Sequence, residues 1–219
     1  MKKIFLLLTL LGFSGAASAA LLYNDRLTFE SALSSSITDT YQDPAYSFIN
    51  TDAEMSAVLG ETQYTSTGFS DLNLVTGGAG GDMSYCSGCN GSFLLDFTST
   101  SVGDSSGVFG VGFDVTSAQN VFGTYAYITF GNGTTENFLL PDANADTGDY
   151  FWGVTDELMI SSIHFGLIDG GTNTNNSIQR MALDDLTIGG SASVPEPSTM
   201  FLFAIGLLGM AVSVKKRLV

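Results

Sequence analysis

The side chains best suited to bind a cation lie in an acidic segment between positions 142 and 149. Oxygen-bearing side chains recur there at about every second position, as they do in calcium-binding loops. They belong to Asp142, Asn144, Asp146 and Asp149. The segment departs from an EF-hand loop, because Thr147 stands at its sixth position and Gly153 at its twelfth. We therefore predict a looser surface calcium site, with a solvated acidic loop as the alternative.

Two adjacent aspartates, Asp184 and Asp185, are further candidate calcium ligands. Met181 and Leu183 share one strand parity, whereas Leu186 and Ile188 share the opposite one. The slip between these pairs predicts a β-bulge at the two aspartates. Such a bulge either directs a carboxylate toward a cation or uses it to satisfy the bulge's own amides.

Two cysteines, Cys86 and Cys89, stand three positions apart within the glycine-rich stretch 77–91. If the chain is exported to an oxidising compartment, as the N-terminal pattern described below predicts, we expect them to form a local disulfide. So small a ring is worth about 2 kcal/mol, which stiffens the loop without holding a domain together. A redox role would need a βαβ setting, and a structural zinc site would need two more soft ligands.

Catalysis has few candidates in this sequence. A nucleophile needs a nearby base, and His164 is the only histidine. A single histidine in a strand is more often a packing or surface residue. Two carboxylates could hydrolyse a glycoside, but no motif singles out a pair among so many acids. We predict no catalytic residues and keep an exported glycan hydrolase as the alternative.

An aromatic platform that stacks on sugar rings is a possible binding site. Its candidate residues are Tyr125, Tyr127 and Trp152, with Tyr150 beside them. The alternative is that these aromatic side chains serve packing between strands.

Strands must position most of these residues, because apolar side chains alternate with polar or small ones over much of the chain after Glu61. Three series have the period of two that a sheet with one buried face produces. They are Phe93, Leu95 and Phe97; Phe109, Val111, Phe113 and Val115; and Phe122, Ala126, Ile128 and Phe130. The third series leaves Tyr125 and Tyr127 facing outward.

The remaining elements are a hairpin, a further strand and two short helices. The turn Gly131-Asn132-Gly133 joins the third series to a partner strand over residues 134–140. A strand with Ile163, Phe165 and Leu167 inward leaves His164 on its other face. Helices are predicted over Leu27–Leu33 and Ala53–Leu59.

Residues 20–193 therefore predict one all-β domain with seven to nine short strands. The absence of βαβ alternation favours an antiparallel β-sandwich, and a jelly roll is the preferred topology. Of the chain's 22 acidic residues only Glu196 lies outside this span, and of its seven basic residues only Arg26 and Arg180 lie inside, which leaves a net charge of −19. That charge disfavours nucleic acid and direct binding to membrane surfaces, and it favours divalent cations.

Both ends of the chain carry targeting patterns. Lys2 and Lys3, the apolar stretch 4–11 and Ala17-Ser18-Ala19 predict a signal peptide over residues 1–19, with Ala20 as the first mature residue. At the other end an uncharged run, residues 199–214, predicts a membrane helix about 24 Å long. The basic tip 215–217 predicts that its C-terminus lies in the cytoplasm.

The C-terminal segment 194–219 resembles the PEP-CTERM sorting signal of Gram-negative surface proteins. The resemblance rests on Val194, Pro195, Glu196, Pro197 and Ser198, followed in order by the apolar run and the basic tip. It implies recognition by exosortase, a membrane-embedded cysteine transpeptidase. An ordinary membrane anchor with a stiff proline linker is the alternative.

Together these patterns indicate an exported, non-catalytic protein of the cell surface or extracellular matrix. The resemblance implies exosortase as a partner, and the domain's aromatic residues leave exopolysaccharide as a possible ligand. We expect a transient stage in the inner membrane before delivery. The sequence predicts no cofactor other than structural calcium.

Overall fold

The computed structural model describes residues 19–68, 71–77, 83–87, 91–119, 123–143, 149–172 and 180–191. The chain before Glu61 holds the short elements, which are β1 (Leu21–Tyr23), α2 (Arg26–Ser31), β2 (Leu33–Asp39), η1 (Pro44–Phe48, a 3-10 helix) and α3 (Asp52–Leu59). The described chain after Glu61 forms strands. They are β3 (Gln63–Ser66), β4 (Leu74–Gly77), β5 (Met83–Cys86), β6 (Phe93–Asp96), β7 (Val108–Gln119), β8 (Thr124–Phe130), β9 (Thr135–Leu140), β10 (Tyr150–Gly166) and β11 (Arg180–Ser191).

The two predicted helices are confirmed, with boundaries set by their caps. Asp25 caps α2 by accepting a hydrogen bond from the Thr28 backbone N–H at 2.8 Å. The helix ends at Ser31, because Leu33 already begins β2. Thr51 and Glu54 form a capping box at the start of α3, and Gly60 ends that helix with a positive φ of 79°.

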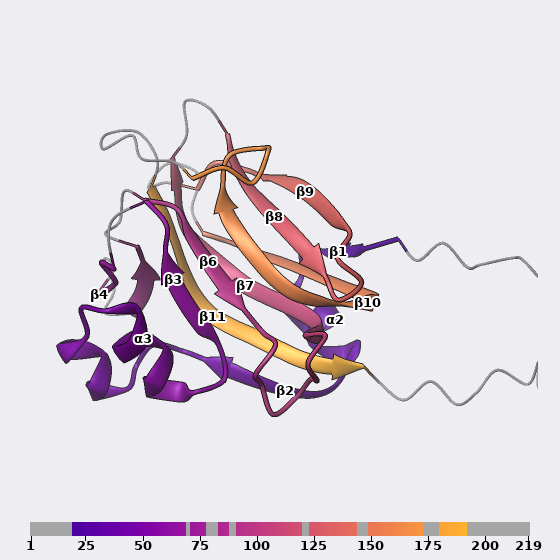
Figure 1. The fold of residues 1–219 in the computed structure, drawn as a ribbon, viewed down its shortest axis with the longest axis horizontal. Helices are drawn as coiled ribbons and strands as arrows, with labels where there is room; N and C mark the ends of the chain where they lie inside the picture. Colours follow the sequence, from indigo (N-terminus) through magenta and orange to yellow (C-terminus); the bar gives the residue numbers. More distant parts are fainter. Residues whose placement is uncertain are drawn as a thin grey trace, which may run out of the picture.

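The strands hydrogen-bond into one antiparallel sheet that curls around a core (Figure 1). Its main path runs β3-β6-β10-β7-β11-β5-β4. The 17-residue strand β10 belongs to both halves of the curl. Residues 150–155 pair with β7, and residues 160–166 pair with β8. Strands β1 and β9 lie off the main path and pair with β10 and β8, respectively.

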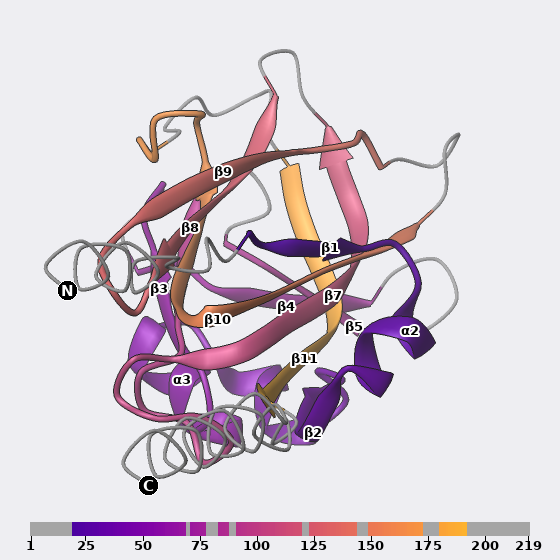
Figure 2. The same cartoon turned by 90° about the vertical axis from the view of Figure 1, so that its right-hand side faces the viewer.

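The predicted all-β, antiparallel class is confirmed, but β10 joins what a sandwich would keep as two separate sheets. Seen from the end, the strands wrap around a common interior (Figure 2). Ring contacts cross that interior: Phe113 of β7 lies 5.3 Å from Phe165 in the second half of β10, measured between ring centroids. The curled antiparallel sheet does not by itself establish a jelly-roll topology, which remains a prediction.

The alternating series largely face the core as expected. Phe93, Leu95 and Phe97 are buried, as are Val111, Phe113 and Val115, and also Ala126, Ile128 and Phe130. Phe109 is only half-buried, because its neighbour Val108 faces the interior instead. Phe122 lies outside the described residues. The predicted hairpin is confirmed, since β8 and β9 pair from Thr129 opposite Thr135 to Thr124 opposite Leu140.

Three glycines on the outer face of the sheet, which we call the glycine floor, let α2 pack closely against it. Gly110 and Gly112 of β7 and Gly153 of β10 leave space for the fully buried ring of Phe29. A Cβ added at Gly112 would lie 2.6 Å from Cζ of Phe151 and 2.7 Å from Cε1 of Phe29. Glycine is therefore needed here for close approach, and Phe29 and Phe151 contact each other with centroids 5.5 Å apart.

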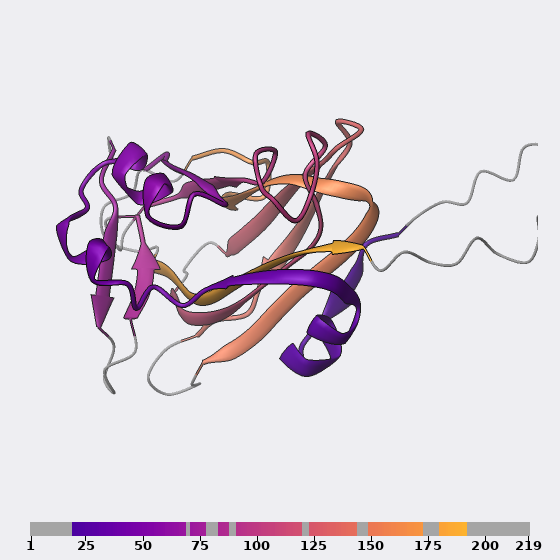
Figure 3. The same cartoon turned by 90° about the horizontal axis from the view of Figure 1, so that it is seen from below.

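The described chain begins and ends at the same end of the molecule. The start of β1 and the last residue of β11 both lie at this end, whereas η1 and α3 lie at the opposite end (Figure 3). Residues 1–18 and 192–219 lie outside the described residues. Within those that are described, no helix has the length and apolar character needed to cross a membrane.

Candidate functional site

The paired aspartates lie at a β-bulge in β11, as predicted. The pairing of β11 with β7 shifts register between Asp184 and Thr187. Asp185 takes a left-handed backbone conformation with φ of 48°. Because the bulge changes the strand's parity, Leu183 before it and Leu186 after it both face the core.

Arg26, the first residue of α2, holds this bulge from the outside. Its Nη1 donates to Oγ1 of Thr187 at 2.9 Å, and its Nη2 donates to the carbonyl oxygen of Asp185 at 3.1 Å. Its guanidinium also lies 4.8 Å from the centroid of the Phe151 ring. The N-cap at Asp25 starts the helix at the point that brings Arg26 to the bulge.

Arg26 also forms ion pairs with two carboxylates. Nη2 lies 3.0 Å from Oδ2 of Asp114, and Nη1 lies 3.6 Å from Oε1 of Glu30. Asp114 and Asp184 stand opposite each other in register on β7 and β11, where like charges repel. The arginine therefore reduces the repulsion that two neighbouring acids would otherwise create.

Asp184 makes a contact of the kind that the second alternative describes. Its Oδ1 accepts a hydrogen bond from the backbone N–H of Asp185 at 2.7 Å, so it satisfies an amide of its own bulge. No group of three or more histidine, cysteine or acidic side chains within the described ranges is arranged to hold a metal ion. In the predicted calcium loop, Asp142 and Asp149 are exposed, whereas Asn144 and Asp146 lie outside the described residues. Calcium binding stays a prediction.

A buried carboxylate that the sequence reasoning missed lies toward the other end of the molecule. Asp39, the last residue of β2, is only 6% exposed. Its Oδ2 accepts hydrogen bonds from the hydroxyl of Tyr46 and, at 3.4 Å, from that of Tyr64. Its Oδ1 accepts the backbone N–H of Tyr41 at 3.0 Å. The hydroxyl of Tyr41 lies 3.0 Å from that of Tyr64, which closes the cluster.

We call Asp39, Tyr41, Tyr46 and Tyr64 the Asp39 cluster. Removal from water raises the pKa of Asp39 above its ordinary value, and the hydrogen bonds from Tyr46, Tyr41 and Tyr64 oppose that rise. Burial also raises the pKa of each of the three tyrosines, which therefore stay neutral donors. Asp39 stands where a strand ends and a turn begins. That position was the only local feature of the sequence that could have identified it as a candidate site residue.

Beside this cluster, Tyr85 of β5 extends the polar contacts to α3. Its hydroxyl donates to Oδ1 of Asn73 at 2.6 Å, and Nδ2 of Asn73 donates to Oδ1 of Asp52 at 2.6 Å. Oδ1 of Asp52 also accepts the backbone N–H of Ser66 at 2.8 Å. These bonds fix α3 and β3 against β5.

His164 lies on the outer face of β10, as predicted, but that face is covered. The side chain is 8% exposed, and its Nε2 lies 2.8 Å from Oγ1 of Thr67. Thr67 in turn donates to Oγ of Ser92, which is buried. The other ring nitrogen, Nδ1, makes no hydrogen bond of ordinary geometry within the described part of the chain, although the Gly170 backbone lies close enough to oppose the effect of burial on the ring's pKa. Burial lowers the pKa of His164, so the ring is neutral at neutral pH.

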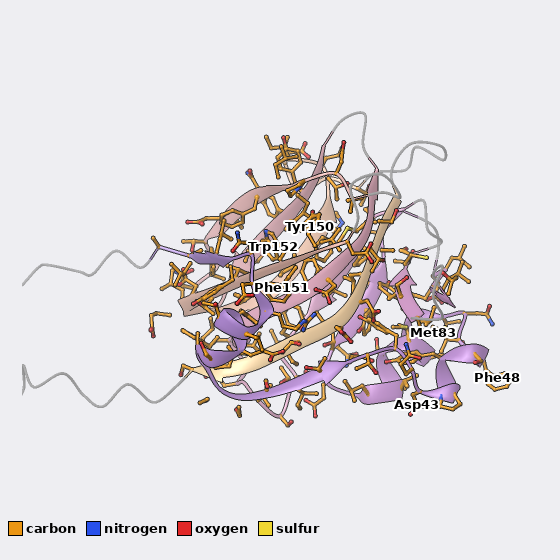
Figure 4. All side chains as sticks on the ribbon, turned by 180° about the vertical axis from the view of Figure 1, so that it is seen from behind. Asp43, Phe48, Met83, Tyr150, Phe151 and Trp152 are labelled. Atoms are coloured by element: carbon orange, nitrogen blue, oxygen red, sulfur yellow. The ribbon has the colours of Figure 1, made fainter. Side chains whose placement is uncertain are left out.

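The aromatic candidates for a glycan platform do not share one surface. Trp152 is buried, with its ring 5.2 Å from that of Phe113 and 6.2 Å from that of Phe138. Tyr125 and Tyr127 face outward from β8 and are half-buried. The sticks in Figure 4 place Tyr150, Phe151 and Trp152 on consecutive positions of β10, and the hydroxyl of Tyr150 donates to the carbonyl of Pro141 at 2.7 Å.

The predicted disulfide falls partly outside the described residues. Cys86 is the buried last residue of β5, whereas Cys89 is not described. Strand β5 pairs with β4 in register from Leu74 opposite Cys86 to Gly77 opposite Met83. The disulfide stays a prediction, and a comparison of intact mass before and after reduction and alkylation would test it.

An apolar hollow of about 430 Å³ lies between η1 and α3. It is lined by Ala45, Phe48, Ile49, Glu54, Ala57 and Val58. Phe48 is 82% exposed and projects from the end of the molecule opposite the start of β1 and the end of β11 (Figure 4). Nothing else in the described part of the structure identifies a partner that would cover this hollow.

The fold and the composition place this chain in the class of antiparallel β-proteins with an acidic surface. The comparison with known families then adds a specific feature, because a model of the PEP-CTERM protein-sorting motif matches residues 193–217. No curated protein and no solved structure matches the chain. The chain is a protein with a PEP-CTERM sorting motif, which implies export, sorting in the cell envelope and processing by exosortase.

Proposed function

We propose that this chain is an exported, non-catalytic protein of the cell surface or extracellular matrix, delivered by exosortase. One observation carries the proposal: the sorting-motif match starts at residue 193, only two positions after β11 ends at Ser191. The motif therefore follows a completed domain directly. Cutting after that domain would free a folded unit.

The chemistry of the motif suits an enzyme that takes an extended substrate. Pro195 and Pro197 lack backbone N–H donors and disfavour helix in the residues before them. Glu196 offers a single negative charge to a basic group in the enzyme. In this proposal residues 199–214 form a transient inner-membrane helix whose basic tip lies in the cytoplasm. Cleavage within Val194–Ser198 then releases the domain.

The described carboxylates support a non-catalytic domain, because many of them already serve local structure. Six aspartates each accept a hydrogen bond from the backbone N–H two residues later. They are Asp39, Asp43, Asp96, Asp104, Asp156 and Asp169. This use of acids in turns accounts for part of the domain's negative charge without a substrate. The alternative of a glycan hydrolase requires turnover that is lost when two neighbouring acids are changed.

Exopolysaccharide is the ligand that we propose for the released domain. Tyr125 and Tyr127 lie two positions apart on the outward face of β8, where tyrosine rings can stack on sugars. The test is retention of the full-length parent on a panel of immobilised glycans, with product release measured in parallel. Binding without turnover supports the proposal, whereas turnover supports the hydrolase. Retention that is unchanged in Y125A/Y127A removes the two tyrosines from the site.

The sorting step is tested by replacing Pro195, Glu196 and Pro197 with alanine. We expect the variant to remain in the inner membrane at full length, whereas the parent is released without peptides from Phe201 onward. The variant A192S, which lies outside the matched segment, is the control and should be released like the parent. Release of the triple variant at the parent's rate would show that processing does not depend on these three residues. A mature parent that retains the tail would leave a simple membrane anchor as the explanation.

A further inference from the structure

An apolar edge lies at the end of the domain from which the sorting segment leaves. It consists of Leu21 and Leu22 of β1 and Leu27 of α2, which we call the leucine edge. Their exposed fractions are 58%, 48% and 76%, respectively. Successive strand residues point to opposite faces, so Leu21 and Leu22 flank the edge strand β1, and Leu27 lies on the neighbouring helix α2. Exposed apolar side chains that lie near one another can contact an apolar partner.

The leucine edge is connected to the point where the chain leaves the domain. Ser191, the last residue of β11, pairs with Leu33 at the start of β2. Leu33 follows α2 by two positions, and α2 in turn contacts β1 through the ring of Phe29, 5.6 Å from that of Tyr23. Figure 2 looks onto this end, with β1 and α2 beside the ends of β2 and β11.

The length of the chain after Ser191 limits how far this end can lie from a membrane. Seven residues, 192–198, separate β11 from the apolar run that begins at Thr199. Fully extended, they reach at most roughly 25 Å. While residues 199–214 are inserted, the leucine edge is therefore held close to the lipid surface at a high effective concentration.

We propose that, before processing, the leucine edge lies on the outer surface of the inner membrane and orients the domain, so that α3 and η1 point away. The inference rests on the proposed membrane stage of the tail. The lipid contact is apolar, because a domain with a net charge of −19 is repelled by anionic headgroups. Three leucines are a small contact, so it depends on the tether and ends when the tether is cut. The same edge thus orients the domain without retaining it.

Tryptophans introduced one at a time into the full-length protein test this orientation in vesicles of zwitterionic lipid with brominated or ordinary chains. Bromine quenches only tryptophans that reach the lipid. The probes are L22W in the leucine edge, F203W in the tail and L59W at the end of α3. Leu59 is the matched control, because its exposed fraction of 43% is close to that of Leu22 and it lies at the opposite end. The parent supplies the background of the buried Trp152.

We expect brominated lipid to reduce the emission of L22W and F203W and to leave L59W unchanged. L27W is a second probe of the edge and should respond like L22W. Quenching of F203W without quenching of L22W or L27W would overturn the orientation and leave the anchored stage intact. Equal quenching of L22W and L59W would also overturn it. If F203W itself is unquenched, the membrane stage of the proposed function fails, and this inference fails with it.

Discussion

Two ionic side chains at opposite ends of the domain are satisfied in different ways. Arg26, beside the chain ends, contacts two carboxylates, a backbone carbonyl, a threonine hydroxyl and an aromatic ring. Asp39, toward the other end, accepts hydrogen bonds from two tyrosine hydroxyls and a backbone N–H. Both ion pairs found among the described residues belong to Arg26.

The difference follows from composition. Residues 20–193 contain two arginines and no lysine, so few of their acids can have a basic partner. A buried acid in such a chain must be stabilised by neutral donors, and tyrosine provides a hydroxyl together with apolar surface for packing. Arg26 lies where its guanidinium can contact several oxygens at once.

The largest effect is expected at Phe29, which places α2 and hence Arg26. F29A removes a fully buried ring from the glycine floor and should lower the free energy of unfolding by about 3–5 kcal/mol. Urea denaturation measures this change. The control is F48A at the exposed Phe48, which should change stability by less than about 0.5 kcal/mol. Similar values for the two variants would mean that the outer face of β7 does not depend on α2.

The Asp39 cluster is tested next by Y46F, which removes one hydroxyl donor and little else. A hydrogen bond to a charged group is worth about 1.5–3 kcal/mol, and we expect a loss in stability of that order. The control is Y127F, whose hydroxyl donates to the exposed Thr135 at 3.1 Å and should matter much less. An equal effect of both variants would show that Asp39 gains nothing special from its tyrosines.

R26K tests whether the arginine acts through its forked geometry or its charge alone. Lysine keeps the charge but cannot reach Thr187 and the Asp185 carbonyl with the same pair of donors. We expect a loss of about 1 kcal/mol in denaturation, on the scale of one net hydrogen bond. E30Q is the control, because that pair is partly exposed at 3.6 Å and contributes little. A fully stable R26K would show that only the charge is needed.

The smallest effect is a pH dependence at Asp39. Burial raises the pKa of Asp39 above 3.8 in the folded state. The folded protein therefore keeps the proton of the Asp39 carboxyl group to a higher pH than the unfolded chain does. Its contribution to stability is therefore greatest below that value and is lost as the pH rises through the raised pKa. D39N lacks this proton, so its stability relative to the parent should improve from about pH 4 to about pH 7.

Comparing the two proteins at each pH removes the opposite slopes that Asp25 and Glu54 contribute, because hydrogen bonds lower the pKa of both. A difference between D39N and the parent that does not vary with pH would show that Asp39 titrates alike in both states.

Local features of this fold could be predicted from the sequence. The alternation in β6, β7 and β8, the turn at Gly131–Gly133, both helices and the bulge at Asp184 all depend on residues within a few positions of each other. The contacts that define the two ionic sites do not. Arg26 and Thr187 are 161 positions apart, and Tyr64 is 25 positions from Asp39. No periodicity encodes which distant strand supplies a partner.

The glycine floor had a partial signal in the sequence. Gly110 and Gly112 alternate with buried residues in β7, which indicates that something approaches the outer face closely. The pattern could not identify Phe29 as the occupant. Likewise, Trp152 was a candidate for the aromatic platform, with packing between strands as the alternative, and its ring is buried against Phe113.

The way in which β11 ends the domain has a mechanical consequence. β11 pairs with β2, β5 and β7, whereas β1 is a three-residue strand that, among the described strands, pairs with β10 alone. A force applied at Ser191 along the strand would load many hydrogen bonds in shear at once. A force applied at Leu21 would peel β1 away one pair at a time. Pulling on the sorting segment therefore stresses the domain along its most resistant direction.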